Sequence, residues 1–379
     1  MIKVTVSVHG RWHAFELAKE LQDRGLLSQL LTTYPRMAVK QITARTLPVT
    51  PKPYLELRRR IYDRWRFGGK PDGVIAAAFG RFASKQVSPD TNLFTGWSSA
   101  SLEAIPIVQG RGGKVVIERG STHIQHQTDV IQAGYERAGL TWDGTDPLII
   151  ERELAEYHAS DAIAVPTVFA RQTFIDYGIP GYKIIVNPYG TDLSIRVKGK
   201  EKIGSGLLRL LFVGGVSVRK GAPWLIEALK DLKGQAVCRF AGPVEPALRQ
   251  MFRAGLPDNV EFLGPLSSAG VDHELATADV FCLPSLEEGF PLSLLEAMAA
   301  GLACVVTPAA SGGVVRDGKN GVLVPPMDVR ALVTALDGIS ADRSRLPGLG
   351  EAARAAVQDG YSWKDYGDRA VAAYEVLLS

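Results

Sequence analysis

The feature that most constrains this sequence is the regular alternation of short runs rich in β-branched residues with segments of helical periodicity. Such alternation predicts parallel sheets covered by helices on both faces, an α/β fold. Residues 2–8 alternate like a strand, and the next segment carries the apolar stripe of a helix from Ala14 to Leu21. Further strands are predicted at residues 27–31, 91–94, 114–118, 161–165 and 183–186.

The alternation occurs twice, which predicts two Rossmann-like domains. A polar stretch punctuated by Pro and Gly, from Asn187 to Gly206, separates the two series. An amphipathic stripe from Trp363 to Leu377 lies far enough beyond the last strand to pack on the first domain. We therefore expect an N-terminal domain of residues 1–187 plus 362–379 and a C-terminal domain of residues 188–361. Strands of the second series are predicted at residues 208–213, 236–240, 260–263, 280–283, 303–306 and 322–324.

Charge, apolar runs and cysteines exclude several classes of protein. A formal net charge of +3 gives no reason to expect a nucleic-acid partner. The first strand meets Arg11 too early for a signal peptide, and no apolar run reaches the length of a membrane span. Cys238, Cys282 and Cys304 stand singly in apolar runs, without the spacing of a zinc or disulfide framework. We expect a cytoplasmic protein whose cysteines are small core residues.

Residues 36–70 form a cationic segment, with ten Lys or Arg residues against two acidic ones. Within it Tyr54, Leu57, Ile61 and Trp65 recur at helical spacing among arginines. Such a helix suits the surface of an anionic membrane. It suits a solvated helix packed by the same stripe on its own domain equally well. In the first case residues 52–70 make a peripheral contact with the inner face of the membrane.

The apolar run of residues 289–315 contains a single charge, Glu296. In the predicted helix this carboxylate shares a face with Leu292 and Leu295, where an unpaired charge is costly. Either a fixed ion pair with an Arg or Lys or a pair of ligand hydroxyls must satisfy it.

The start of the same helix has the features of an anion site. Pro291 is predicted at the first helical position, and Gly301 as the cap after the end. Glu288 precedes the helix, beside Gly289, whose missing side chain lets a ligand approach the backbone. The free amides from Gly289 to Leu292 attract an anion. An anion flanked by two carboxylates indicates a phosphorylated, hydroxyl-rich ligand.

A second candidate element follows the strand at residues 208–213. Gly214 and Gly215 form a turn, and Arg219 and Lys220 precede a helix that begins near Pro223. Two cations at a helix N-terminus oppose the helix dipole. They are either a solvated pair or the binding site of an anion such as a diphosphate.

These motifs resemble those of the retaining glycosyltransferases of family 4. The resemblance covers nearly the whole chain and is most specific in the C-terminal half. It implies the GT-B fold, in which two Rossmann-like domains face each other across a cleft and the last helix crosses back to the N-terminal domain. The motifs that carry it are Arg219-Lys220-Gly221, Glu261-Phe262-Leu263-Gly264, Glu288-Gly289-Phe290 and Leu295-Glu296-Ala297-Met298.

The resemblance also implies roles for the charged residues. Lys220, helped by Arg219, holds the diphosphate of a nucleotide-sugar donor. Glu296 binds the ribose hydroxyls, and Glu288 with the amides after it grips the donor sugar. His123, which follows a strand, meets the sugar from the acceptor side, although a histidine there is also a common helix cap.

The other donor-binding candidates are mostly small or apolar. Many members of the family carry an Arg where this chain has Gly215, and we expect Arg219 to supply that charge. Further candidates are Gly10, Gly214, Gly289, Phe290, Leu292 and Leu263.

The predicted function is retaining, metal-independent sugar transfer from a nucleotide-sugar to a saccharide or lipid-linked acceptor, as in envelope or exopolysaccharide synthesis. No metal site or cofactor is expected, because the chain has no aspartate pair spaced as DxD. A nucleotide-sugar 2-epimerase of the same fold and a non-catalytic nucleotide-sugar-binding protein are the alternatives. A Rossmann dehydrogenase is excluded because the turn after the first strand, residues 9–13, lacks GxGxxG.

Overall fold

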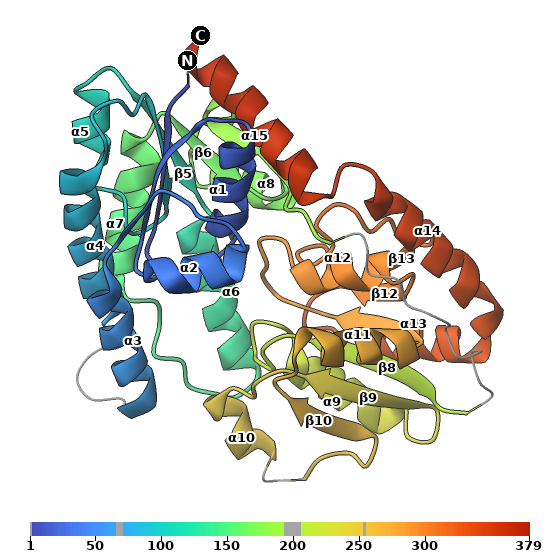
Figure 1. The fold of residues 1–379 in the computed structure, drawn as a ribbon. Coiled ribbons are helices and arrows are strands. Elements are labelled where there is room, and N and C mark those ends of the chain that lie inside the picture. Colours follow the sequence, from blue (N-terminus) through green and yellow to red (C-terminus); the bar gives the residue numbers. More distant parts are fainter. Residues whose placement is uncertain (1, 66–70, 193–205, 253–254) are drawn as a thin grey trace.

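The computed structural model describes residues 2–65, 71–192, 206–252 and 255–379. Two parallel sheets form the centres of two domains, as the alternation of strands and helices predicts (Figure 1). Arg66 and Lys70 of the cationic segment, and residues 193–205 of the predicted linker, lie outside the described residues.

The N-terminal sheet has seven parallel strands in the order β3-β2-β1-β4-β5-β6-β7. Its central strands are buried on both faces, as expected where helices cover both sides of a parallel sheet. The strand order reverses at β1, so the loops after β1 and β4 border the crevice where such sheets bind ligands. The strands are β1 (Val4–Val8), β2 (Leu27–Thr32), β3 (Val49–Pro51), β4 (Leu93–Trp97), β5 (Lys114–Glu118), β6 (Ala162–Val165) and β7 (Ile184–Val186).

The helices of this domain connect successive strands. Where α6 begins, the side chain of His123 accepts a hydrogen bond from an amide of the first turn, and at the start of α7 Asp146 does the same. The helices are α1 (Ala14–Asp23), α2 (Arg36–Thr43), α3 (Pro53–Trp65), α4 (Asp72–Gln86), α5 (Ile105–Gln109), α6 (Ile124–Arg137), α7 (Pro147–Ala159) and α8 (Val168–Asp176).

The last helix, α15 (Trp363–Leu378), returns to the N-terminal domain, as predicted. A capping box between Ser362 and Asp365 starts it. Figure 1 shows it beside α1, and the buried Tyr374 hydroxyl accepts a hydrogen bond from Thr95 of β4 at 3.1 Å. The predicted domain boundaries are compatible with this arrangement but are not tested by it.

The C-terminal sheet has six parallel strands in the order β10-β9-β8-β11-β12-β13, again reversing at its first strand. Cys238, Cys282 and Cys304 lie buried in three of these strands, which confirms them as small core residues. The strands are β8 (Leu208–Val213), β9 (Ala236–Ala241), β10 (Val260–Gly264), β11 (Val280–Leu283), β12 (Ala303–Val306) and β13 (Gly321–Leu323). The helices are α9 (Ala222–Asp231), α10 (Pro246–Phe252), α11 (Ser268–Thr277), α12 (Leu292–Ala299), α13 (Val329–Ala341) and α14 (Leu346–Gln358).

The structure departs from the sequence prediction in a few places. The edge strand β3 is not predicted, because it has three residues, one of them Pro51, and lies in the cationic segment. Pro291 lies one residue before α12 rather than at its first position, whereas Gly301, at φ +75°, follows the helix end as expected. Among the described residues, no helix combines the length and apolar character needed to cross a membrane.

Candidate active site

The loop between β8 and α9, residues 214–221, brings two cations, Arg219 and Lys220, to the carboxyl edge of the C-terminal sheet. We call it the cation loop. Gly221 begins α9 with φ +76°, and a side chain there would meet the carbonyl oxygen of Pro284 at 2.0 Å. Only glycine fits this turn without displacing the backbone of the neighbouring loop. The stem of Lys220 lies beside Gly214, while the space next to Gly215 is open. The predicted residues Gly214, Gly215 and Lys220 therefore share one loop surface.

Glu288 lies directly against these cations. Its carboxylate accepts hydrogen bonds from Lys220 Nζ at 2.5 Å and Ser285 Oγ at 3.0 Å, and Arg219 lies 3.4 Å away. Burial alone would raise the pKa of Glu288, but Arg219 and Lys220 outweigh it and hold the pKa below its usual value. The carboxylate is therefore ionised and paired at neutral pH.

This pairing changes one step of the sequence argument. The two cations oppose the dipole of α9, and the sequence left them as either a solvated pair or the binding site of an anion such as a diphosphate. In the structure protein carboxylates balance them, because Arg219 also contacts Glu287, at 3.3 Å. An incoming diphosphate would have to share Arg219 and Lys220 with Glu287 and Glu288.

Glu296 is in a different situation on α12. It is half-buried on the same helix side as Ser293 and the exposed Leu292, while Leu295 points into the core. Among the described residues no cation pairs with the Glu296 carboxylate, and none donates a hydrogen bond to it. Burial, and secondarily Asp272 on α11, raises its pKa. Of the two ways to satisfy this carboxylate, the fixed ion pair is not found in the described structure.

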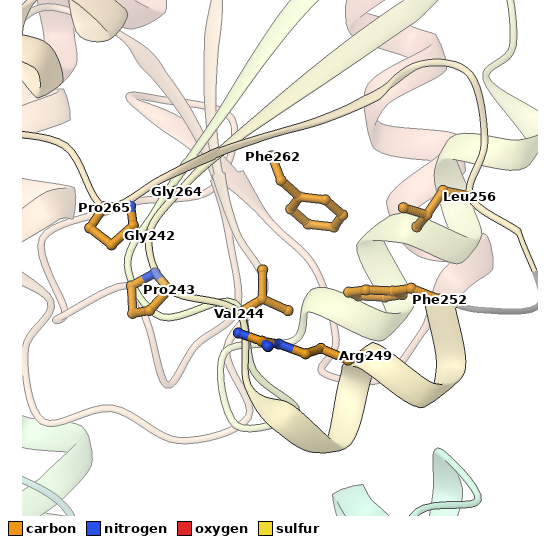
Figure 2. A pocket seen from close by; sticks show the side chains of 9 residues that line it. All are labelled: Gly242, Pro243, Val244, Arg249, Phe252, Leu256, Phe262, Gly264 and Pro265. Carbon is orange, nitrogen blue, oxygen red and sulfur yellow. The ribbon is translucent and has the colours of Figure 1, made fainter. Parts of the chain in front are cut away.

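A cavity of about 660 Å³ opens at the carboxyl ends of β9 and β10 (Figure 2). Phe252 and Phe262 stack with ring centroids 5.2 Å apart on one side of it, and Arg249 extends from α10 along its edge. It borders the cation loop, because a side chain at Gly242 would meet the carbonyl oxygen of Gly214 at 1.9 Å. The lining residues are Gly242, Pro243, Val244, Arg249, Phe252, Leu256, Phe262, Gly264 and Pro265.

The sequence analysis missed this cavity. It singled out Leu263, which lies half-buried on β10 between two lining residues but does not line the cavity itself. The available signal was a second glycine turn, Gly242-Pro243, after a strand at the same sheet edge as Gly214.

Gly289 contacts the N-terminal domain, and Phe290 packs against the two segments that join the domains. A side chain at position 289 would meet the carbonyl oxygen of Gly120 in the N-terminal domain at 2.0 Å, so the backbones touch there. The ring of Phe290 is buried between Tyr189 and Tyr361, with centroid distances of 6.3 and 5.9 Å. The approach that Gly289 permits is thus made by protein backbone in this structure.

His123 has the capping role that the sequence left open. Its Nδ1 accepts a hydrogen bond from the amide of Gln125 at 3.3 Å, and its buried ring stacks on Tyr177 at 4.7 Å. Burial, with Arg119 nearby, lowers its pKa to about 4, so the ring is neutral at pH 7. Among the described residues it makes no hydrogen bond to Lys220 or Glu288, and its contact with a donor sugar stays a prediction.

Several buried polar atoms at the carboxyl edge of the N-terminal sheet have no hydrogen-bond partner among the described residues. They belong to Ser7 within β1, His9 directly after β1, Thr33 after β2, and Trp97 at the end of β4. Buried polar groups are normally paired, so such a concentration suggests a place for polar ligand groups or water. Gly10 lies in the same region, with its carbonyl accepting from Thr32 Oγ1 at 2.9 Å.

The sequence analysis also missed Glu287, which is fully buried between the domains. Its Oε1 accepts hydrogen bonds from Ser121 Oγ, from the amide of Thr122 at 3.1 Å and from the Thr122 hydroxyl at 2.8 Å. No local pattern in the sequence distinguishes it from the neighbouring Glu288. Only the tertiary structure separates their partners.

Comparison with known proteins agrees with this architecture. Residues 208–342 match the family model described as glycosyl transferases group 1. The putative colanic acid biosynthesis glycosyltransferase WcaL of Salmonella typhimurium is 36% identical over 42% of this chain and 42% of its own length. The D-inositol 3-phosphate glycosyltransferase of Geodermatophilus obscurus is 29% identical over 70% of this chain and 64% of its own. The chain thus spans less than two thirds of either relative.

A solved structure resembles the whole chain. Anabaena Alr3699/HepE in complex with UDP-glucose superposes with a TM-score of 0.69, covering 99% of this chain and 100% of that one at 16% identity. At this identity the likeness concerns the fold. The two parallel-sheet domains and the returning last helix are those of the GT-B fold, which confirms the predicted fold class.

Proposed function

We propose that the protein is a retaining, metal-independent glycosyltransferase of family 4 that takes its sugar from a nucleotide-sugar bound by the C-terminal domain. The observation that carries the proposal is the half-buried carboxylate of Glu296, which has no partner among the described residues and lies in the same domain as the cation loop and the cavity. A ribose ring supplies the hydroxyl donors that this carboxylate lacks. The match of residues 208–342 to glycosyl transferases group 1 supports it, because this range contains all three features.

The geometry suggests how the donor lies. A base in the cavity beside Gly242 places a diphosphate near Arg219 and Lys220, since Gly242 and Gly214 are in contact. The backbone amides of Leu292 and Ser293, at the start of α12, have no acceptor among the described residues and can also serve a phosphate or sugar oxygen. The donor sugar then lies toward Glu288 and the N-terminal domain.

The proposed reaction is a substitution at the anomeric carbon on one face of the sugar. The bond between that carbon and the diphosphate oxygen breaks, the acceptor oxygen bonds to the carbon, and the acceptor proton passes to the departing phosphate. Negative charge grows on the diphosphate, and Arg219 and Lys220 stabilise it from fixed positions. Glu288 is held by Lys220 and positions the sugar rather than acting as a base.

We also propose that the acceptor, a saccharide or lipid-linked glycan, binds at the N-terminal sheet edge. Polar atoms of Ser7, His9 and Thr33, which have no hydrogen-bond partner within the described residues, are available there to acceptor hydroxyls. Burial, with Arg59 and Arg152 nearby, lowers the pKa of His9 to about 4, so it offers a neutral ring at pH 7. WcaL is by its name a glycosyltransferase of colanic acid biosynthesis, and an acceptor in envelope or exopolysaccharide synthesis fits the same class.

A thermal-shift screen against UDP, GDP and ADP tests the donor half of this proposal. One of the three is expected to raise the apparent stability by ~2.7 kcal/mol at a hundred times its dissociation constant, because it binds the folded state alone. Product analysis with the matching nucleotide-sugar then separates transfer from 2-epimerisation and from simple binding. The absence of a rise in melting temperature with all three nucleotides would contradict the proposal.

The α3 helix gives the proposed membrane contact a structural basis. Tyr54, Leu57, Ile61 and Trp65 lie on one face of α3 and are 52–64% exposed. Arg58 lies on the same face and is also exposed. Apolar side chains and arginine on one exposed face fit an anionic lipid surface at the inner side of a membrane.

Replacing Leu57 and Ile61 together by Glu is expected to weaken sedimentation with phosphatidylserine-containing vesicles about tenfold or more. The change removes apolar area that membrane binding would bury, and it adds repulsion from the lipid charge. Val376 of α15, 77% exposed on another helix, provides the matched control as Val376→Glu. Equal binding of the parent to pure phosphatidylcholine vesicles, or equal binding of both variants, would contradict the contact.

A further inference from the structure

Two carboxylates of the C-terminal domain reach the N-terminal domain and hold the cation loop at the same time. Glu287 accepts from Ser121 and Thr122 and pairs with Arg219 at 3.3 Å. Glu245 accepts from the hydroxyl of Tyr135 on α6 and from the amide of Val218 at 3.1 Å. The loop at residues 214–221 is therefore held from both domains.

Glu287 is the more buried of the two links. Its side chain is 0% exposed, and Gln127 Nε2 lies 3.3 Å from its second oxygen. A buried carboxylate is stable only where donors compensate its lost hydration. Most of its donors come from residues 121–127 of the N-terminal domain, and Arg219 is the one cation within ion-pair distance of it among the described residues, while Arg119 acts on it from farther away.

These hydrogen bonds determine how strongly Glu287 competes with a bound phosphate for Arg219. With the N-terminal donors in place, much of the carboxylate charge is satisfied without the guanidinium. Without them, Arg219 becomes the main partner of Glu287 and has less charge to offer to a phosphate. Hydrogen bonds from the N-terminal domain thus change how much of the Arg219 charge in the C-terminal domain is available to a phosphate.

We propose that Glu287 is a positioning residue through which Ser121 and Thr122 of the N-terminal domain increase the affinity of the cation loop for a nucleoside diphosphate. The inference rests on the proposed function for the identity of the ligand. Ser121 and Thr122 act through Glu287, so their effect requires its carboxylate. The contact between Gly120 and Gly289 keeps the two segments adjacent.

A double-mutant cycle tests this coupling. The probe is whichever of UDP, GDP and ADP stabilises the parent, and its dissociation constant is measured by calorimetry. Ser121→Ala/Thr122→Val is expected to weaken binding about tenfold in the parent, as for the loss of charge-assisted hydrogen bonds. In the Glu287→Gln background the same double change is expected to weaken binding less than about twofold.

Glu274→Gln provides the matched control background. Glu274 is also a buried carboxylate of the C-terminal domain paired with an arginine, Arg239, at 2.5 Å, but its partner lies within the same domain. The tenfold loss should persist in this background. An equal loss in the parent and Glu287→Gln backgrounds, or no loss in the parent, would overturn the inference.

Hydrogen exchange gives a readout that needs no nucleotide. The amides of residues 214–221 should exchange faster in Ser121→Ala/Thr122→Val than in the parent, because the loop loses its support from the N-terminal domain. Unchanged exchange would overturn the coupling even if the nucleotide screen succeeds. Faster exchange with no nucleotide binding would instead place the failure in the proposed function.

Discussion

Glu296→Gln is expected to reduce kcat/KM for sugar transfer about a hundredfold while leaving the fold intact. In the proposed complex the carboxylate accepts two hydroxyl hydrogens of the ribose, whereas an amide can accept only one of them well. A loss of this size is typical for removing one fixed polar contact in an enzyme site. Steady-state kinetics with the nucleotide-sugar identified by the screen provide the measurement.

The stability of this variant separates a ligand contact from a structural one. Because the pKa of Glu296 is raised from about 4.5 in the folded protein, the ionised side chain destabilises the fold. Below pH 4.5 the parent and Glu296→Gln should be equally stable. As the pH rises through the raised folded pKa, the variant should become the more stable of the two. A lower melting temperature of Glu296→Gln at pH 7 would indicate a structural role.

Lys220→Met is expected to reduce transfer more than a hundredfold and also to destabilise the protein by ~2 kcal/mol. Transfer falls because a fixed cation beside the departing diphosphate is lost. Stability falls because Glu288, 5% exposed, then keeps only Ser285 and Arg219 as partners among the residues that the structure describes. The stability loss should be largest above the usual Glu pKa and shrink as the pH falls through the lowered pKa of Glu288.

The double variant Lys220→Met/Glu288→Gln distinguishes the two effects. Gln at position 288 is neutral and keeps the hydrogen bond to Ser285, so most of the lost stability should return. Transfer should not return, because the cation is still missing. Recovery of transfer together with stability would show that Lys220 acts only by holding Glu288.

Most of the fold follows from sequence periodicity. Strands such as β5, β8 and β11 begin and end where the sequence predicts, because a strand covered by helices on both faces carries a largely apolar run. The return of α15 could be anticipated from its stripe, of which Tyr366, Ala370 and Tyr374 are buried. The edge strand β3 could not, because its pairing with β2 is a tertiary contact with little local signal.

The candidate site was only partly predictable, for a physical reason. Motifs identified Arg219, Lys220, Glu288 and Glu296 as residues of interest, but a motif does not show which charges pair. Glu288 and Glu296 are both acidic residues near one helix, yet Glu288 pairs with Lys220 whereas Glu296 has no partner in the described part of the chain. Glu287 and the cavity at Phe252 and Phe262 depend on segments far apart in the chain, so the only local signal was the turn at Gly242 for the cavity, and Glu287 had none.

The contact between Glu296 and a ribose can be measured directly. Calorimetry on the parent and on Glu296→Gln, each with the nucleoside diphosphate found by the screen and with its 2′,3′-dideoxy analogue, isolates it as a coupling energy. We predict that the parent binds the natural diphosphate at least about tenfold more tightly than the analogue and that Glu296→Gln barely distinguishes them. The same preference in both proteins would contradict the assignment of the donor site.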